Sequence, residues 1–133
     1  MALQYSVTLR NNKLDQVEST AGASAVLRIL TGALPANCAA AETGTIVATV
    51  VLPADWMNAA AGGTKTKLGT WQDATADNTG TATYFRIYDS GITACHVQGS
   101  YGTSGTDMVG DSASFTAGQS FTINSFTLTA GNA

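Results

Sequence analysis

Apolar and polar residues follow two different periods along this chain, and the period changes at Gly22. Before that residue, Leu14 and Val17 recur at a spacing typical of one face of an α-helix. Ser6 is a residue type that caps the start of helices, and glycine commonly follows their last turn. The pattern therefore predicts a short N-terminal helix over residues 6–20.

The first ten residues also fit a strand, because Leu3, Tyr5 and Val7 alternate with polar neighbours at a period of two. Residues 13–18 distinguish the two interpretations. They combine charges with good helix formers and contain no turn dipeptide that would close a hairpin. We therefore favour the helix.

After Gly22 the apolar runs are short, rich in β-branched residues and bounded by Gly, Asn, Asp or Pro, which is typical of strands joined by turns. Many short strands predict a mainly β fold, a two-sheet β-sandwich or jelly roll with the short helix at its N-terminus. We expect one domain, with an arm and helix over residues 1–22 and the β-sandwich over residues 23–133. The predicted strands are residues 25–31, 45–52, 66–73, 81–89, 92–100, 112–116 and 119–129.

The sequence also predicts the structure of two connections between strands. Residues 31–45 form a loop too long for a hairpin turn, and we expect it to cross from one sheet to the other. Residues 53–59 predict a helical turn that ends at the glycine pair 62–63, with Trp56 and Met57 covering one end of the core.

The last predicted strand changes phase. Its apolar alternation shifts between Ile123 and Phe126. One inserted residue has this effect, so we expect a β-bulge near Asn124 or Ser125.

Length and charge narrow the classes of function. The chain has 133 residues, a net charge of -3 and 11% charged residues, which suits one domain that folds by burial alone. Its cations are dispersed, so no nucleic acid is expected as a partner. No run approaches the roughly 20 apolar residues that cross a bilayer, and the opening residues lack the features of a secretory leader. We therefore expect that the protein does not associate with a membrane. We also expect that it is synthesised in a cytoplasm.

Candidate catalytic groups are few. Cys95 and His96 are adjacent in a predicted strand, where neighbouring side chains point to opposite faces, so they cannot act together as nucleophile and base. Cys38 could serve as the nucleophile only if its loop folds back over that strand. Cys38 and Cys95 admit one disulfide, although free thiols are expected in a chain without a secretory leader.

Metal ligands are equally sparse. Two cysteines and one histidine are too few for a four-ligand zinc site. Asp73 with Asp77, and Asp107 with Asp111, are candidate calcium ligands, but neither pair follows the order of an EF-hand loop and both fit solvated turns. We expect no catalytic, cofactor-binding or metal residues, no cofactor, and no enzyme activity.

Aromatic side chains offer an alternative binding function. Trp71, Tyr84 and Tyr88 could form a sugar-binding face. In a small sandwich, however, most aromatic side chains fill the core, and we favour that interpretation.

Five segments spread over most of the chain carry a resemblance to a known family. They are LQYSVTLRNNKLDQVEST (3–20), LRILTGALPANCAAAETGT (27–45), LPADWM (52–57), TATYFRIYDSG (81–91) and FTINSFTLTAGNA (121–133). In these segments the chain resembles the jelly-roll cementing, or decoration, proteins that tailed bacteriophages place on the outside of HK97-type capsids.

The resemblance implies a virion structural protein on the capsid exterior, assembled in the host cytoplasm, that bridges neighbouring major capsid protein subunits after the shell has expanded. It also implies a homodimer or homotrimer, and it transfers no residue role to this chain. The alternative is a phage tail or fibre component, or a carbohydrate-binding β-sandwich module. Helix 6–20 is the candidate assembly element, because its apolar stripe must be buried either on a partner or on its own sandwich.

Overall fold

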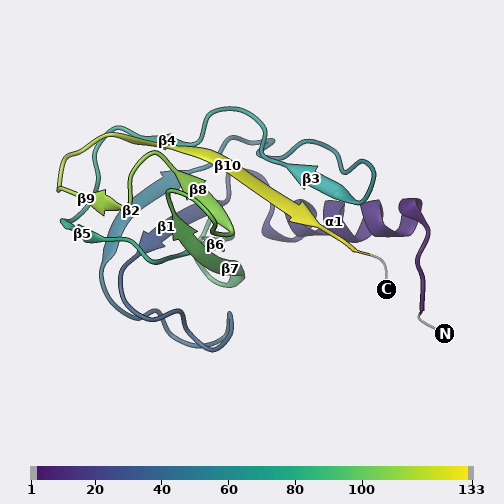
Figure 1. Cartoon of the computed structure of the whole chain (residues 1–133), viewed down its shortest axis with the longest axis horizontal. Coiled ribbons are helices and arrows are strands. Elements are labelled where there is room, and N and C mark those ends of the chain that lie inside the picture. The colour runs from purple at the N-terminus through teal and green to yellow at the C-terminus, as the bar shows by residue number, and fades with distance from the viewer. Residues whose placement is uncertain (1–2, 132–133) are drawn as a thin grey trace.

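The computed structural model describes residues 3–131 and is mainly β, with one helix at the N-terminus (Figure 1). The strands form a curled sheet and a small second sheet, an arrangement compatible with a β-sandwich. This confirms the predicted fold class. The helix is α1 (Val7–Ala21), and the strands are β1 (Val26–Leu30), β2 (Ile46–Val51), β3 (Thr64–Thr66), β4 (Gln72–Asp73), β5 (Gly80–Thr81), β6 (Tyr84–Tyr88), β7 (Cys95–Gly102), β8 (Met108–Gly110), β9 (Ser114–Phe115) and β10 (Phe121–Thr129).

α1 begins and ends where the capping residues predict. The Ser6 hydroxyl accepts a hydrogen bond from the backbone N–H of Leu9 at 3.1 Å. Gly22 takes a φ of 86° and donates its N–H back into the last turn, a conformation that suits glycine because it lacks a Cβ. Leu14 and Ala21 are buried, so the later turns of the helix pack on their own domain.

The large sheet curls over itself. Its strand order is β2-β1-β6-β7-β8-β10-β3, with β4 also paired to β10. β6 and β10 are not neighbours in this order, yet the Phe85 and Phe126 rings lie edge to face with their centroids 5.4 Å apart. The part of the sheet around β6 therefore faces the part around β10 across the core, as the layers of a sandwich do. The small sheet pairs β5 with β9.

The core between these layers is aromatic. The ring centroids of Trp56 and Trp71 are 5.9 Å apart, and Trp71 lies 5.7 Å from Phe126. A second group places Phe115 edge-on to Phe121 at 4.9 Å. All five side chains are buried. Because rings of this size remove the largest apolar areas from water, these contacts dominate the packing of the core.

The connection after β2 differs from its prediction. The helical turn expected over residues 53–59 is wrong, because Met57 bridges to Lys67 in the manner of a strand. The glycine pair 62–63 turns the chain with φ values of 61° and 77°. Two successive positive φ values fit a two-residue hairpin turn. Trp56 and Met57 are nevertheless at most 1% exposed and cover the core, as predicted.

Two predicted strands are split in the structure. The strand expected at 66–73 is present only at its ends, because β3 ends at Thr66 and β4 begins at Gln72. The two strands pair with separate parts of β10. Between them the chain leaves the sheet, and the Trp71 indole is buried with its N–H donated to the carbonyl of Leu68 at 3.1 Å. The strand expected at 81–89 is divided into β5 and β6, which belong to different sheets.

The other predicted strands are present with shifted ends. Those at 25–31, 45–52, 92–100, 112–116 and 119–129 correspond to β1, β2, β7, β9 and β10, whereas the short strand β8 was not predicted. In β10 the pairing with β8 shifts between Ile123 and Ser125, which makes Asn124 the extra residue. The predicted bulge is confirmed.

The loop over residues 31–45, here called the covering loop, does not cross between sheets. That prediction is wrong, because β1 and β2 are antiparallel neighbours and the loop returns to the sheet that it left. Instead it lies over the outer face of β6, where Tyr84, Arg86 and Tyr88 bond to it. All five residues of β6 are buried as a result, one set by the core and the other by this loop. The length of the loop allows it to cover β6.

Polar contacts of Lys65 with Asp15 and Glu18, here called the anchor, join α1 to the strands. Lys65 of β3 is 2% exposed, and its ammonium nitrogen lies 2.8 Å from an Asp15 oxygen and 3.2 Å from a Glu18 oxygen. The same carboxylates accept backbone hydrogen bonds from the hairpin, Asp15 from Ala60 and Glu18 from Trp56, both at 2.9 Å. A buried ammonium is costly unless it is paired and hydrogen-bonded, so this contact fixes the position of the helix.

Replacing Lys65 by methionine tests this anchor. Lys65→Met leaves Asp15 and Glu18 facing each other without their cation, and we expect the free energy of unfolding to fall by about 3 kcal/mol. Guanidinium denaturation followed by tryptophan fluorescence measures the change. Lys67→Met is the control, because the Lys67 ammonium makes an exposed hydrogen bond to the Gly69 carbonyl, and it should cost less than about 1 kcal/mol. Equal losses in the two variants would contradict the anchor.

The carboxylates of the anchor titrate away from their ordinary values. The hydrogen bond from Lys65 holds the pKa of Asp15 below its usual range. Burial acts to raise the pKa of Glu18, but hydrogen bonds, first among them the one from the Met57 N–H, outweigh burial and leave that pKa lowered. The pKa of Asp55 changes in the opposite direction to those of Asp15 and Glu18, because its contact with Glu18 raises it.

Acid is therefore expected to loosen the anchor. A carboxylate with a lowered pKa stabilises the fold above its unfolded pKa, and this contribution is lost as the pH falls through the folded value. From the ordinary values of 3.8 for Asp15 and 4.5 for Glu18, the loss should begin below about pH 4.5. Denaturation curves collected down to pH 2 should show a shallower loss in Lys65→Met than in the wild type. If the free energy of unfolding falls equally with pH in the two proteins, Lys65 does not cause the sensitivity to acid.

Candidate functional site

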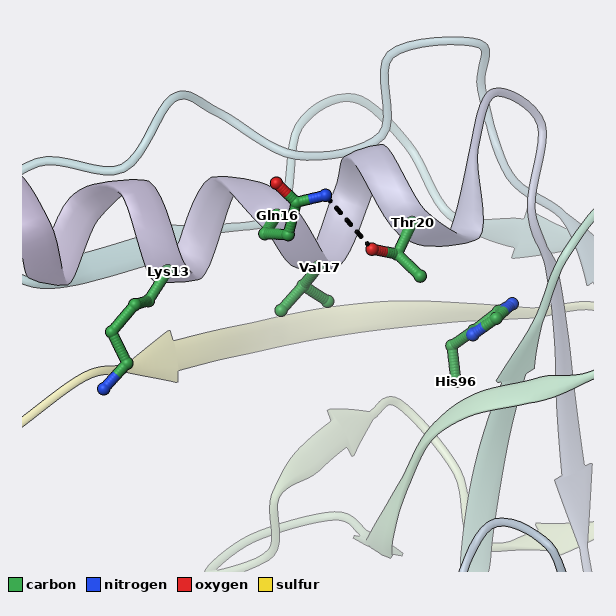
Figure 2. A pocket seen from close by; sticks show the side chains of 5 residues that line it. All are labelled: Lys13, Gln16, Val17, Thr20 and His96. Carbon is green, nitrogen blue, oxygen red and sulfur yellow. Dashed lines mark hydrogen bonds between the residues drawn. The ribbon is translucent and has the colours of Figure 1, made fainter.

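α1 and β7 border a shallow groove of about 260 Å³ beside His96 (Figure 2). Val17 and Thr20 of α1 lie near the imidazole, whereas the Lys13 side chain points away from it. The Gln16 amide donates to the Thr20 hydroxyl at 3.4 Å. The groove thus offers one imidazole beside an apolar side chain and hydrogen-bonding groups.

A β-bulge sets the directions of Cys95 and His96. Between β6 and β7, Ile87 pairs with Val97 and Tyr88 pairs with Cys95, so His96 is the extra residue. In a regular strand Cys95 would share a face with Val97. The bulge instead places Cys95 on the outer face with Tyr88, while His96 borders the groove at α1. As predicted, the two side chains lie on different sides and form no nucleophile and base pair.

The outer face of β6 holds the covering loop through a buried guanidinium. Arg86 is 2% exposed, and it donates to the backbone carbonyls of Asn37 and Ala40 at 3.1 and 2.8 Å. It also donates to the side chains of Gln98 at 3.1 Å and Tyr88 at 3.4 Å. A planar guanidinium with five N–H groups can bind several oxygens at once, which an ammonium on a single stem cannot do. The conformation of the loop therefore depends on Arg86.

Glu42 of the covering loop joins this cluster. Its carboxylate accepts from Arg28 at 2.9 Å and from the Tyr88 hydroxyl at 2.8 Å. Burial raises the pKa of Tyr88, as does the bond to Glu42, while Arg86 acts to lower it. Burial acts to lower the pKa of Arg86, but the bond with Tyr88 and nearby groups raise it overall. Glu42 is thus paired directly with Arg28, whereas Arg86 is linked to it only through the Tyr88 hydroxyl.

Beneath the covering loop lies a cavity of about 600 Å³ that Cys38 and Cys95 both line. The two thiols lie close enough to influence each other's titration, and the Cys95 thiol donates to the Val97 carbonyl at 3.4 Å. Burial raises the pKa of Cys95 to about 12, and the contact with Cys38 adds to the rise. Both residues are free thiols. The loop does fold back over β7, but it brings Cys38 to a second thiol and not to the groove at His96.

The paired carboxylates serve separate turns. Asp77 accepts from the Thr49 hydroxyl at 2.7 Å, and Asp107 accepts from the hydroxyl of Ser100 at 2.9 Å. Asp73 and Asp111 accept backbone N–H groups. Within residues 3–131, no group of three or more His, Cys, Asp and Glu side chains is arranged to hold a metal ion.

The aromatic residues of the sugar-binding hypothesis are not available to a ligand. Trp71 and Tyr84 are 0% exposed, and Tyr88 is 7% exposed. Trp71 lies in the core, as predicted, whereas the hydroxyls of Tyr84 and Tyr88 bond to the covering loop. An aromatic ring must present a face to solvent to stack on a sugar, so these three residues form no sugar-binding face.

Apolar side chains are exposed at the start of the chain. Leu3, Val7 and Leu9 are 67%, 47% and 43% exposed, and we call residues 3–9 the N-terminal projection. It lies at the end of α1 that points away from β1, β2 and β6 (Figure 1). In the described part of the chain, α1 is too short and too polar to span a membrane. Three large apolar side chains are thus exposed within seven residues at one end of the molecule.

The sequence analysis did not single out Lys65 or Arg86, although a signal for each was present. Each is the central cation of a short strand, Lys65 between threonines and Arg86 between aromatic and apolar residues. A lone cation in a strand that packs on a core must either reach water or be hydrogen-bonded, because an unpartnered buried charge is not tolerated. Asp15, Asn37 and Ala40 lie 46 to 50 positions away from the cation that they bind, so spacing could not reveal these partners.

No family model, curated protein or solved structure matched this chain when it was compared with them.

Replacing Arg86 by lysine tests whether Arg86 holds the covering loop in place. Arg86→Lys keeps the charge but cannot reach both loop carbonyls in the same geometry. We expect at least about tenfold faster hydrogen–deuterium exchange in residues 31–45 and a loss of about 2 kcal/mol in unfolding free energy. Arg28→Lys is the control, since Arg28 makes one bond to Glu42. If mass spectrometry shows equal protection in both variants, Arg86 does not hold the loop.

Proposed function

We propose that this chain is a virion structural protein that decorates a phage capsid and stabilises it by bridging neighbouring major capsid protein subunits. The observation that carries this proposal is the N-terminal projection, where Leu3, Val7 and Leu9 expose apolar surface at one end of the molecule. The resemblance of the sequence to capsid decoration proteins supports the same function.

A binding element that bridges rigid subunits needs a firm connection to its own body. α1 has this connection through the buried Lys65 and, nearer its start, through two further contacts. Arg10 donates to the carbonyl of Ala130 at 3.3 Å, and Asn11 accepts the N–H of Gly63 at 2.9 Å. Because the helix is already ordered, little conformational entropy is lost when its exposed side chains bind. We propose that the projection inserts into an apolar hollow at a subunit junction.

Repetition on the capsid compensates for a small contact. The projection offers three exposed apolar side chains, which on their own support a modest affinity. A capsid presents the same junction many times, and an oligomer that engages several junctions gains affinity without new contacts. For this reason we propose that the protein binds as a homodimer or homotrimer.

Cosedimentation with expanded empty capsids of the phage or prophage that encodes the chain tests this function. Wild-type protein should bind saturably and raise the melting temperature of the capsid. Val7→Ser/Leu9→Ser should weaken binding at least about tenfold, because it removes apolar area from the projection. Both residues are exposed, so the melting temperature of the variant itself should stay within a few degrees of the wild type.

Val51→Ser is the matched control, because Val51 is 70% exposed but lies on β2, away from the projection. It should bind as the wild type does. Equal losses in the two variants would show that the projection is not the binding element. A wild-type protein that neither pellets with capsids nor changes their melting temperature would overturn the proposed function, and a monomer by light scattering would overturn the proposed oligomer.

A further inference from the structure

Two thiols that are distant in the sequence meet in the cavity beneath the covering loop. Cys38 belongs to that loop and Cys95 begins β7. Their side chains line the same cavity of about 600 Å³ and lie close enough to influence each other's titration. The meeting depends on the bulge at His96, which turns Cys95 to the outer face of the sheet. The contact is therefore built by two irregular features of the fold, a long loop and a bulge.

The backbone around Cys38 is held on both sides. Arg86 donates to the carbonyls of Asn37 and Ala40. The Asn37 side chain in turn accepts the N–H groups of Ala39 and Ala40 at 2.9 and 3.0 Å. These four hydrogen bonds keep the Cys38 thiol beside its partner. Thiols that are held together react with each other faster than with a second molecule, because their encounter no longer depends on diffusion.

The cavity also gives small reagents access to the sulfur atoms. Thr93 and Ala94 line it and are exposed. Cys38 and Cys95 are themselves partly exposed rather than buried in the core. A low-molecular-weight oxidant can therefore reach the pair without unfolding of the protein.

We propose that Cys38 and Cys95 form an intramolecular disulfide when the protein meets a disulfide oxidant such as oxidised glutathione. One cysteine thiolate attacks the glutathione disulfide, breaks its S–S bond, forms a mixed disulfide and releases one glutathione. The second cysteine thiolate attacks the protein sulfur of that mixed disulfide, forms the Cys38–Cys95 bond and releases the second glutathione. The oxidant gains two electrons from the cysteines, and their two protons end on the two released glutathiones.

This bond ties the covering loop covalently to β7. In a reducing cytosol the thiols remain free, whereas in an oxidising environment the disulfide forms and persists. It stabilises the fold because it restricts the unfolded chain over the long segment between the two residues. The inference does not depend on the proposed function, since the covering loop and the N-terminal projection belong to different parts of the chain.

Oxidation of the reduced, folded protein with oxidised glutathione tests the proposal. Intact mass should fall by about 2 Da, and a non-reducing peptide map should contain a linked pair of peptides with Cys38 and Cys95. The melting temperature should rise by about 10 °C and return to its first value with dithiothreitol. The reaction should be faster at pH 9 than at pH 7, because the attacking species is the thiolate.

Cys38→Ser/Ala39→Cys is the matched control, because it keeps two cysteines but moves one thiol by a single position within the same held segment. It should form the intramolecular bond at least about tenfold more slowly than the wild type. Equal rates in the two proteins would show that the observed geometry is not what joins the thiols. A wild type that gains only stable glutathione adducts, forms only linked dimers, or keeps both thiols would overturn the proposal.

Discussion

A buried ammonium ion determines how the helix and the sheet of this protein fit together. Lys65 points from β3 into the contact with α1, and removing its charge from water is favourable only because Asp15, Glu18 and the carbonyl of Asn58 surround it. Each carboxylate also binds backbone N–H groups of the neighbouring hairpin. One cation thus fixes the register of the helix against the hairpin. Apolar contacts alone would define this register less narrowly, because they have no preferred direction.

The covering loop follows the same principle at the other face of the sheet. Arg86 is as deeply buried as Lys65, and its donors are taken by the loop carbonyls and by polar side chains on β6 and β7. The apolar core holds the two layers together, while these two cations decide where the helix and the loop lie on its outside. The parts of the molecule that can meet partners or reagents are the N-terminal projection and the cavity with its thiols. Polar contacts position both of them, and for the helix they add to the apolar packing of Leu14 and Ala21.

The sequence predicts best where the partners of a segment are local. The helix follows from its own period and from Ser6 and Gly22, and most strands follow from alternation between turn residues. The division of residues 66–73 into β3 and β4 depends on which parts of β10 they meet, about 55 positions later. The path of the covering loop likewise depends on Arg86. Such choices are made by tertiary contacts, which periodicity does not encode.

The two bulges show why the candidate site was harder to foresee than the fold. At Asn124 the extra residue lies in a strand whose apolar residues, such as Ile123 and Phe126, otherwise alternate, so the shift can be read from the sequence. At His96 it lies among residues that are all half-buried, and the shift leaves no trace in the pattern. Yet this second bulge turns the Cys95 thiol to the outer face of the sheet, where Cys38 lies. The chemistry of this face is set by one inserted residue whose effect appears only when the neighbouring strand is in place.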